Sequence, residues 1–315
     1  MGKIAFIFPG QGSQTVGMGL ALAEAEQSVM AFFQKADKKL NLPLSELIFN
    51  GPQEELTLTT NAQPALLTTC IAILEYFKQS GVKPDYVAGH SLGEYTALVA
   101  AGVISFEDGV YAVRKRGEYM EEAVPNGEGT MAAVLGLDRD KLREITEEIT
   151  TEGTIVQLAN LNCPGQIVIS GSRKGVELAS LKAKESGAKR VMPLVVSGPF
   201  HSELMKPAAE KFTSVLNDFH MNDAAVPVIA NVTAREMTSI DEMKERLIEQ
   251  LYSPVLWEDS VQRMLQLGVD TFIEIGPGKV LSGLVKKINK TVRTFNVSDK
   301  DTCMNVIELL KEENQ

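Results

Sequence analysis

The chain has 315 residues, of which 44% are hydrophobic and 23% are charged, and its formal net charge at pH 7 is −10. This composition is typical of a folded globular protein and excludes a disordered or collagen-like chain. The acidic balance argues against a protein that binds nucleic acid through its phosphates. No apolar run of the sequence reaches the roughly 18 residues that a membrane span needs, so we expect neither nucleic acid nor a membrane as a partner.

The three cysteines, Cys70, Cys163 and Cys303, are far apart and form no C-x-x-C pair. This spacing does not indicate a disulfide framework or a structural zinc site. The apolar run at the N-terminus ends at Pro9-Gly10, which is too early for a signal peptide. We therefore expect a reduced, cytoplasmic protein that holds no metal.

The first part of the chain is predicted to alternate strands and helices, which favours a parallel sheet with helices on its faces. Within the helix predicted over 64–80, Asn61 is the expected cap, Pro64 suits the first turn, and Gly81 ends the helix. Ser105 is the expected cap of a later helix. The predicted order is strand 4–8, helix 64–80, strand 85–89, helix 92–101 and a helix that ends near 123.

A glycine-rich stretch at 125–129 marks a change of pattern. The order that follows is β-α-β-β-α-β, the ferredoxin-like arrangement. Its predicted elements are strand 130–135, helix 139–151, strand 154–161, strand 166–170, helix 174–186 and strand 188–196. Helices and short strands then resume, with strands at 226–231 and 269–275 and a helix from 279. We therefore predict an α/β domain of residues 1–124 and 198–315, with 125–197 inserted and the ligand site in the cleft between them.

The sharpest chemical signal is Gly89-His90-Ser91-Leu92-Gly93, a G-x-S-x-G motif between an apolar strand and a helix. This context is what a nucleophile elbow requires. Ser91 is then the expected nucleophile, at the positive end of the following helix. The alternative is a serine that caps an ordinary helix.

A serine nucleophile needs a base, and the sequence offers three histidines, His90, His201 and His220. His90 is expected to point away from its neighbour on the elbow, and His220 reads as a surface residue. His201 lies in a loop that returns from the insert and is the expected base. No acidic third member is evident, although a backbone carbonyl can also orient an imidazole.

Two glycine-rich loops fail the nucleotide-binding patterns. After the first predicted strand, Thr15 stands where a dinucleotide fingerprint needs its third glycine. In the second loop, Ile273 stands where a P-loop needs its first glycine. The first loop is still able to supply a backbone N–H group to an oxyanion.

A run of cations, Arg114, Lys115 and Arg116, follows on the next predicted helix. At helical spacing, Arg114 and Arg116 flank the apolar stripe and Lys115 points outward. Either arginine is able to hold a carboxylate with two hydrogen bonds. Periodicity does not choose between them, and a solvated charge run is the alternative.

Together the motifs resemble the malonyl-CoA:acyl-carrier-protein transacylases of fatty acid synthesis and, more widely, the acyltransferase domains of polyketide synthases. The matching stretches run in the family's order over nearly the whole chain. They are FPGQGSQ (8–14), NAQPA (61–65), GHSLGEY (89–95), RG (116–117), PFHS (199–202), EQL (249–251) and GPG (276–278). The resemblance implies an α/β-hydrolase-like domain with a ferredoxin-like insert.

The resemblance also implies the roles of the reacting groups. Ser91 is expected to be the nucleophile and His201 its base, with the backbone N–H groups of Gln11 and Leu92 as the oxyanion hole. Arg116 is expected to bind the malonyl carboxylate.

Further residues carry implied roles around these groups. The main-chain carbonyl of Gln250 is expected to orient the histidine. Gln63, Asn160 and Asn162 are expected to line the site. Phe200 resembles the residue of malonyl-selective domains and is expected to crowd an α-methyl group.

The implied reaction moves a malonyl group from malonyl-CoA to the phosphopantetheine thiol of acyl carrier protein by a ping-pong route. We expect a monomer that uses no cofactor. Because the carrier protein is generally acidic in this family, docking calls for a local positive surface. The expected cations are Lys189, Arg190, Lys286, Lys287 and Lys290. The alternatives are a serine esterase or thioesterase with the same elbow, and a non-catalytic docking protein.

Overall fold

Two sheets organise the fold of the computed structural model, which describes residues 2–125 and 127–312. Within these residues the larger sheet has the order β10-β9-β1-β2-β7-β8, and every neighbouring pair is parallel except β7 and β8. Its strands are β1 (Lys3–Phe8), β2 (Tyr86–Gly89), β7 (Val228–Ile229), β8 (Glu236–Met237), β9 (Val269–Ile275) and β10 (Arg293–Val297). This parallel sheet agrees with the prediction for the outer parts of the chain.

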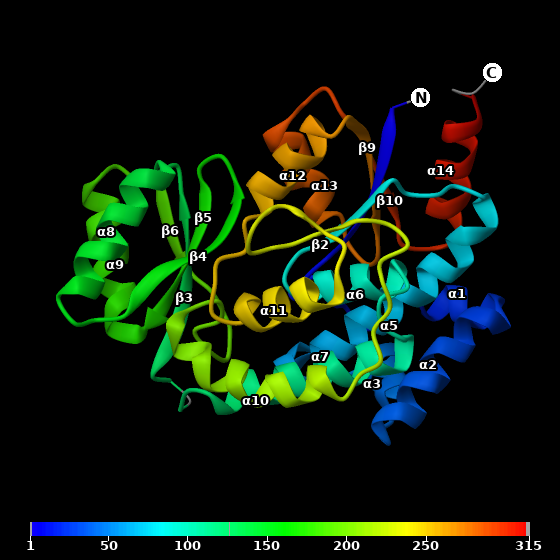
Figure 1. Cartoon of the computed structure of the whole chain (residues 1–315), viewed down its shortest axis with the longest axis horizontal. Coiled ribbons are helices and arrows are strands. Elements are labelled where there is room, and N and C mark those ends of the chain that lie inside the picture. Colours follow the sequence, from blue (N-terminus) through cyan, green and yellow to red (C-terminus); the bar gives the residue numbers. More distant parts are fainter. Residues whose placement is uncertain (1, 126, 313–315) are drawn as a thin grey trace.

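The smaller sheet is antiparallel, has the order β4-β5-β3-β6, and stands to the left of the larger one in Figure 1. Two helices cover one of its faces, and their apolar residues form a core of their own with the sheet. The elements are β3 (Gly129–Leu135), α8 (Arg139–Thr151), β4 (Val156–Cys163), β5 (Gln166–Ser172), α9 (Arg173–Glu185) and β6 (Arg190–Pro193). The chain thus combines a mostly parallel sheet with a separate antiparallel one.

Helices cover both faces of the larger sheet because its central strand is apolar on both sides. Along β1, Phe6 and Phe8 enter the core on one face, while Ala5 and Ile7 enter the core on the other. The second face is covered by α12 (Trp257–Gln266) and α13 (Val280–Ile288).

The first face is covered by a larger group of helices, whose apolar side chains form the main core. These are α1 (Leu20–Ala25), α2 (Gln27–Leu40), α3 (Leu44–Asn50), α4 (Gln53–Thr57), α5 (Thr59–Phe77), α6 (Leu92–Ala100), α7 (Phe106–Glu122), α10 (Lys206–Asn217), α11 (Ile240–Gln250) and α14 (Lys300–Glu312). Short 3₁₀ turns, Lys78–Ser80 and Glu203–Met205, follow α5 and precede α10.

The prediction of a helix over 64–80 was wrong at its start, whereas a 3₁₀ turn continues α5 to Ser80 and Gly81 ends it, as predicted. Helix α5 begins at Thr59, so Pro64 lies inside it and Asn61 is not its cap. Proline cannot donate to the carbonyl four residues earlier, that of Thr60. Arg114 of α7 donates from Nη1 to this oxygen at 3.1 Å, which compensates for the missing bond. A partner this distant in the sequence is not visible in the local pattern.

Other predicted boundaries were closer. The helix at 139–151 and the strand at 269–275 are confirmed, and Ser105 caps α7 by accepting from the N–H of Asp108. The strand predicted over 188–196 is limited to Arg190–Pro193, because β6 pairs with β3 only along that short stretch. In the described part of the chain, every helix is too short or too polar to cross a membrane.

Candidate active site

Ser91 lies on a sharp turn between β2 and α6. Its backbone has φ 52° and ψ −111°, which a non-glycine residue adopts only under strain. The turn needs glycine on both sides. A Cβ atom on Gly89 would lie 1.9 Å from the backbone of Gly93, and one on Gly93 would lie 2.3 Å from the carbonyl oxygen of Phe8. The G-x-S-x-G spacing therefore follows from how closely β1, β2 and α6 pack.

The Ser91 hydroxyl contacts one imidazole, that of His201. Ser91 Oγ lies 2.8 Å from His201 Nε2, and His201 Nδ1 lies 2.8 Å from the main-chain oxygen of Gln250. Because a carbonyl oxygen only accepts, Nδ1 carries the proton and Nε2 is left to accept from the serine. Burial, with the nearby Arg116 charge, lowers the pKa of His201 to about 3. The imidazole is therefore neutral and able to take a proton near neutral pH.

Arg116 reaches the same hydroxyl from α7. Its side chain is 1% exposed, and Nη2 donates to Ser91 Oγ at 3.0 Å and to Gln250 Oε1 at 3.0 Å. Nη1 donates to Gln63 Oε1 at 2.7 Å. The guanidinium also stacks over the ring of Tyr95, at 5.4 Å from its centroid. All of these partners are uncharged. Burial lowers the pKa of Arg116.

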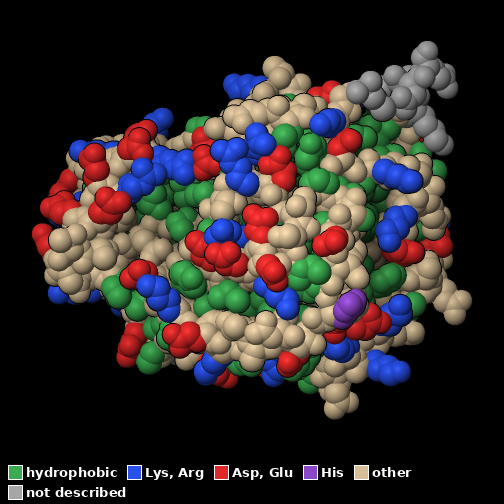
Figure 2. All heavy atoms as spheres, viewed as in Figure 1, with side chains coloured by type: hydrophobic (Ala, Val, Ile, Leu, Met, Phe, Trp, Pro, Cys, Tyr) green, Lys and Arg blue, Asp and Glu red, His purple; other side chains and the backbone are tan. Residues whose placement is uncertain are grey.

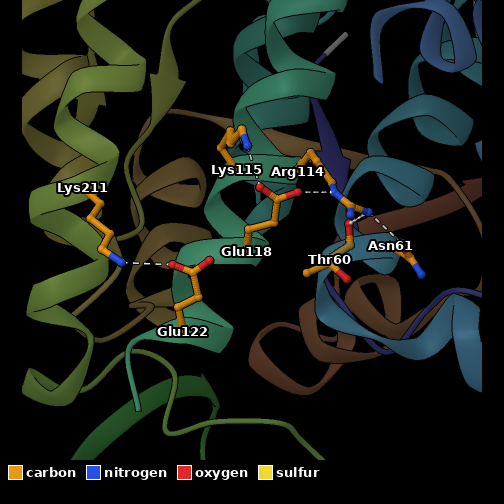
Figure 3. Close-up of polar contacts among 7 residues, drawn as sticks. All are labelled: Thr60, Asn61, Arg114, Lys115, Glu118, Glu122 and Lys211. Carbon is orange, nitrogen blue, oxygen red and sulfur yellow. Dashed lines mark hydrogen bonds and ion pairs between the residues drawn. The ribbon is translucent and has the colours of Figure 1, made fainter. Parts of the chain in front are cut away.

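The neighbouring cations point elsewhere (Figure 3). Arg114 binds Glu118 and Asn61 as well as the Thr60 carbonyl, and Lys115 binds Glu118 at the surface. The choice between the two arginines that periodicity left open is therefore decided by packing. Arg116 faces the serine, and Arg114 supports α5.

A cavity of about 190 Å³ opens over the serine and the imidazole. Its walls come from loops and helices beside the larger sheet and from β3 and β4 of the smaller sheet. Its lining residues are Gln11, Gly12, Gln14, Thr57, His90, Ser91, Leu92, Arg116, Met120, Met131, Asn160, Leu194, Val195, Val196, Phe200 and His201. The segment 194–196, predicted as strand, is part of this wall.

The predicted oxyanion donors, Gln11 and Leu92, both line the cavity. Leu92 is the first residue of α6, and the first N–H groups of a helix have no intrahelical acceptor. Gln11 follows the end of β1, and its side chain is held by Thr59 at 3.1 Å. Both residues therefore follow the carboxyl ends of the central strands β1 and β2, beside the turn that carries Ser91.

The residues predicted to line the site lie at two different places in the structure. Asn160 and Phe200 line the cavity. Gln63 and Asn162 are not among the residues that line the cavity, and each binds a residue that does. Gln63 holds Arg116, and Asn162 binds the Nε2 atom of His90 at 2.8 Å. His90 is thus engaged away from the serine, as predicted.

Two buried residues near the serine were not predicted as site residues. Asn231, just after β7, accepts from the Ser91 N–H at 2.7 Å and donates to the Gly89 carbonyl at 2.7 Å. Glu94, one turn along α6, accepts from Gln250 Nε2 at 2.6 Å. Glu94 directly follows the elbow motif, and this position was the only sign of a role in the sequence. Its partner Gln250 lies 156 residues away, so their contact was not predictable from the local pattern.

The chemistry of the site is that of a serine nucleophile with a neutral base and a fixed cation. In the described residues, no group of three or more His, Cys, Asp or Glu side chains is placed to hold a metal ion.

Comparison with known proteins adds to this geometry. The model of the acyl transferase domain matches residues 5–314. The chain belongs to the acyl transferase family. It is 64% identical to the malonyl CoA-acyl carrier protein transacylase of Bacillus subtilis, over 100% of this chain and 99% of that protein. It is 49% identical to the protein of the same name from Staphylococcus aureus, over 94% and 96%.

Solved acyl transferase structures agree over the whole chain. The malonyl CoA-acyl carrier protein transacylase of Clostridium perfringens superposes with a TM-score of 0.95 at 43% identity, and 99% of this chain and 98% of that one are covered. A malonyl-transacylase solved in complex with its type II PKS acyl-carrier protein has a TM-score of 0.95 at 42% identity, over 98% and 99%. The resemblance drawn from the motifs is confirmed.

Proposed function

We propose that this acyl transferase moves a malonyl group from malonyl-CoA to the phosphopantetheine thiol of acyl carrier protein. The observation that carries the proposal is the buried Arg116 guanidinium beside Ser91 Oγ, with hydrogen bonds only to neutral groups among the described residues. A buried cation is costly unless an anion reaches it. An acyl group that ends in a carboxylate supplies that anion next to the reacting carbon. The names of the relatives support the same substrate.

The first half of the reaction loads the serine. His201 takes the Ser91 proton as the oxygen attacks the thioester carbon of malonyl-CoA. The N–H groups of Gln11 and Leu92 stabilise the tetrahedral oxyanion. When the carbon–sulfur bond breaks, the proton on His201 passes to the sulfur, and free CoA leaves a malonyl ester on Ser91.

The second half reverses these steps with a different thiol. His201 removes the proton of the phosphopantetheine thiol, and the sulfur attacks the malonyl ester. The serine oxygen leaves, regains its proton from His201, and the malonyl thioester of the carrier protein is released. No metal or organic cofactor takes part in either half.

Selectivity in this mechanism comes from two sides of the cavity. Arg116 exchanges its bond to the serine hydroxyl for two bonds to the malonyl carboxylate, which fixes the acyl group. The buried ring of Phe200 occupies the space that an α-methyl group needs.

The decisive experiment is intact-mass measurement of the protein after incubation with malonyl-CoA or acetyl-CoA and no acceptor. We expect one malonyl group on Ser91 and none on S91A. Loss of a charged hydrogen-bonding partner predicts that R116A lowers malonyl loading by roughly 100-fold, with a much smaller effect on acetyl loading. An equal loss with both acyl groups would contradict the carboxylate role of Arg116.

A serine esterase or thioesterase is the second candidate, because the same elbow and base serve hydrolysis. It differs in the fate of the ester. Rapid release of malonate to water in the absence of a thiol would favour the hydrolase, whereas an ester that persists until a carrier protein is added supports the transferase. A protein that forms no ester at all would be a docking protein.

We also propose that residues 125–197 form a ferredoxin-like subdomain inserted into an α/β-hydrolase-like domain of residues 1–124 and 198–315. The supporting observations are the element order β3-α8-β4-β5-α9-β6 and the strand order β4-β5-β3-β6, in which the first strand lies between the third and the fourth.

For the carrier protein we propose a docking surface of Lys189, Arg190, Lys286, Lys287 and Lys290. All five are exposed. Lys287 of α13 donates to Gln166, the first residue of β5, at 3.0 Å. Arg190 of β6 pairs with Leu135 of β3, the strand next to β5. Such a patch would attract an acidic partner despite the net charge of −10. We propose that the protein acts as a monomer in the cytoplasm, where its free, buried cysteines stay reduced.

A further inference from the structure

Glu94 is a buried carboxyl group that takes no direct part in the proposed reaction. Glu94 lies on α6 and is 0% exposed. Its Oε2 atom accepts from Gln250 Nε2 at 2.6 Å and from the N–H of Asn231 at 3.2 Å. Burying a carboxyl group costs free energy unless hydrogen bonds offset that cost. The two bonds to Gln250 and Asn231 therefore indicate the role of Glu94.

The Gln250 side chain has only one favourable orientation in this setting. Its Nε2 atom donates to Glu94 and to the Ser91 carbonyl at 3.0 Å, while its Oε1 atom accepts from Arg116 at 3.0 Å. If the amide were reversed, its NH₂ group would face the guanidinium, and its oxygen would face a carboxyl and a carbonyl oxygen. An amide is nearly symmetric in shape, so its partners decide which way it points.

Asn231 extends the same control to the elbow. Its backbone N–H is held by Glu94, and its side chain binds the Ser91 N–H and the Gly89 carbonyl, each at 2.7 Å. The carboxyl group thus contacts the support of the nucleophile on one side and the support of Arg116 on the other.

We propose that Glu94 is a positioning residue, which sets the orientation of the Gln250 amide and thereby holds the Arg116 guanidinium where an acyl carboxylate binds. The inference rests on the proposed function, since it assigns a purpose to the arginine that the reaction uses. Acting through Gln250, Glu94 determines the preference for acyl groups that carry a carboxylate.

The electrostatics of the site agree with this role. Burial raises the pKa of Glu94 to about 8, so the group is mostly neutral at pH 7 and leaves the positive charge of Arg116 uncancelled. Arg116 of α7 is the cation that acts on Glu94, and Tyr95 of α6 is the other titratable group coupled to it. Gln250 and Asn231 contribute neutral amides from α11 and the loop after β7.

Two conservative variants separate the length of the Glu94 side chain from its carboxyl group. E94Q keeps the side-chain length and an acceptor oxygen for Gln250 and Asn231. Its NH₂ group takes the place of Oε1, which has no partner among the described residues. E94D keeps the carboxyl group, but its shorter side chain cannot span to Gln250. Thermal unfolding of both variants checks that they fold.

The measurement is single-turnover loading of Ser91 by malonyl-CoA and by acetyl-CoA without an acceptor, followed by intact mass. We expect E94Q to keep the malonyl-to-acetyl ratio of kcat/KM within about threefold of the unchanged protein, and E94D to lower it by roughly tenfold or more, because a mispositioned arginine loses binding made only to the carboxylate. Acetyl loading should change little in E94Q and should fall less than malonyl loading in E94D, whose shorter side chain also weakens the bond to Asn231.

The inference is overturned if E94D keeps the original ratio, if E94Q loses as much as E94D, or if E94D slows both acyl groups equally. The unchanged protein distinguishes this failure from that of the proposed function. If it forms no malonyl ester, the proposed function fails. If it forms one selectively and E94D remains equally selective, only the role of Glu94 fails.

Discussion

At the scale of single residues, the Ser91 hydroxyl lies between a base and a cation. It is 2.8 Å from His201 Nε2 and 3.0 Å from Arg116 Nη2. The cation has an effect on the base as well, because its charge helps to keep the imidazole unprotonated. The hydroxyl therefore donates its proton to His201 Nε2 and accepts a hydrogen bond from Arg116 Nη2.

This arrangement predicts an unusual pH profile for loading by malonyl-CoA. The pKa of His201 is lowered from its ordinary 6.5 to about 3. Because only the neutral imidazole acts as a base, kcat/KM of the free enzyme should stay level from pH 7 down to about 5. A fall with a midpoint near 6.5, measured by single-turnover loading, would contradict the assignment.

Two histidine variants complete that measurement. Removal of a general base costs roughly 100-fold or more, so H201A should load slowly while remaining folded. H90A is the matched control, since the Nε2 atom of His90 is bound to Asn162 and does not contact Ser91. If H90A were the slower variant, His201 would not be the base.

Part of this residue-scale chemistry was predictable from the sequence. Ser91 and His201 were identified from a local motif and from the small number of histidines, and the structure brings them together. Arg116 was not separable from Arg114 by periodicity, because both flank the same apolar stripe. Glu94 was not assigned a role, because that role depends on Gln250, far along the chain.

At the scale of elements, the elbow depends on close packing of β1, β2 and α6. Gly93, the second residue of α6, lies directly against the end of β1, where a Cβ atom would lie 2.3 Å from the Phe8 carbonyl oxygen. This carbonyl accepts from the N–H of His90 at 3.1 Å, so it cannot move aside without breaking that bond. The second glycine of the motif is therefore needed for helix–sheet packing, and not only for the turn.

A pair of glycine substitutions tests this view. G93A should lower the free energy of unfolding by about 2 kcal/mol or more, as overpacking does, and should also slow malonyl loading. G283A is the control within α13, where an added Cβ atom meets nothing within 4 Å. Alanine in that open helical position should raise stability by about 0.5–1 kcal/mol. Denaturant unfolding measures both, and a neutral G93A would contradict the packing argument.

The start of α5 and the length of β6 were not predicted correctly from the local sequence. The sequence of α5 contains Pro64, and local rules place a proline in the first turn of a helix. The helix instead begins at Thr59, because Arg114 of α7 binds the carbonyl that the proline leaves free. Strand β6 is shorter than its apolar sequence predicts, because its length is set by pairing with β3.

At the scale of the whole molecule, the cavity lies where the smaller sheet meets the main core, which Met131, Ala159 and Val168 of that sheet join. The bidentate pair of Arg139 with Asp259 joins α8 to α12 at 2.8 and 2.9 Å. Leu161 of β4 donates to the Val255 carbonyl at 2.9 Å and ties the smaller sheet to the loop before α12. On the face shown in Figure 2, acidic and basic side chains are interspersed.

The proposed docking surface leads to a prediction at this scale. K189E combined with R190E should raise the KM for acyl carrier protein by roughly tenfold and make it less sensitive to salt, because charged surfaces act mainly on encounter. Loading of Ser91 by malonyl-CoA should remain unchanged, as both residues are exposed and outside the cavity lining. K182E with K184E on α9 is the matched control. Equal effects of the two pairs on transfer would rule out this surface.

The sequence alone determined the features that depend on neighbouring residues. These are the alternation of strands and helices, the glycine-flanked serine, and the order of motifs that resembles the acyl transferases. Tertiary structure decided which arginine faces the serine, which way the Gln250 amide points, and where α5 begins. The physical reason is that each of these depends on hydrogen bonds between residues 25 or more positions apart, and no local pattern encodes such a pairing.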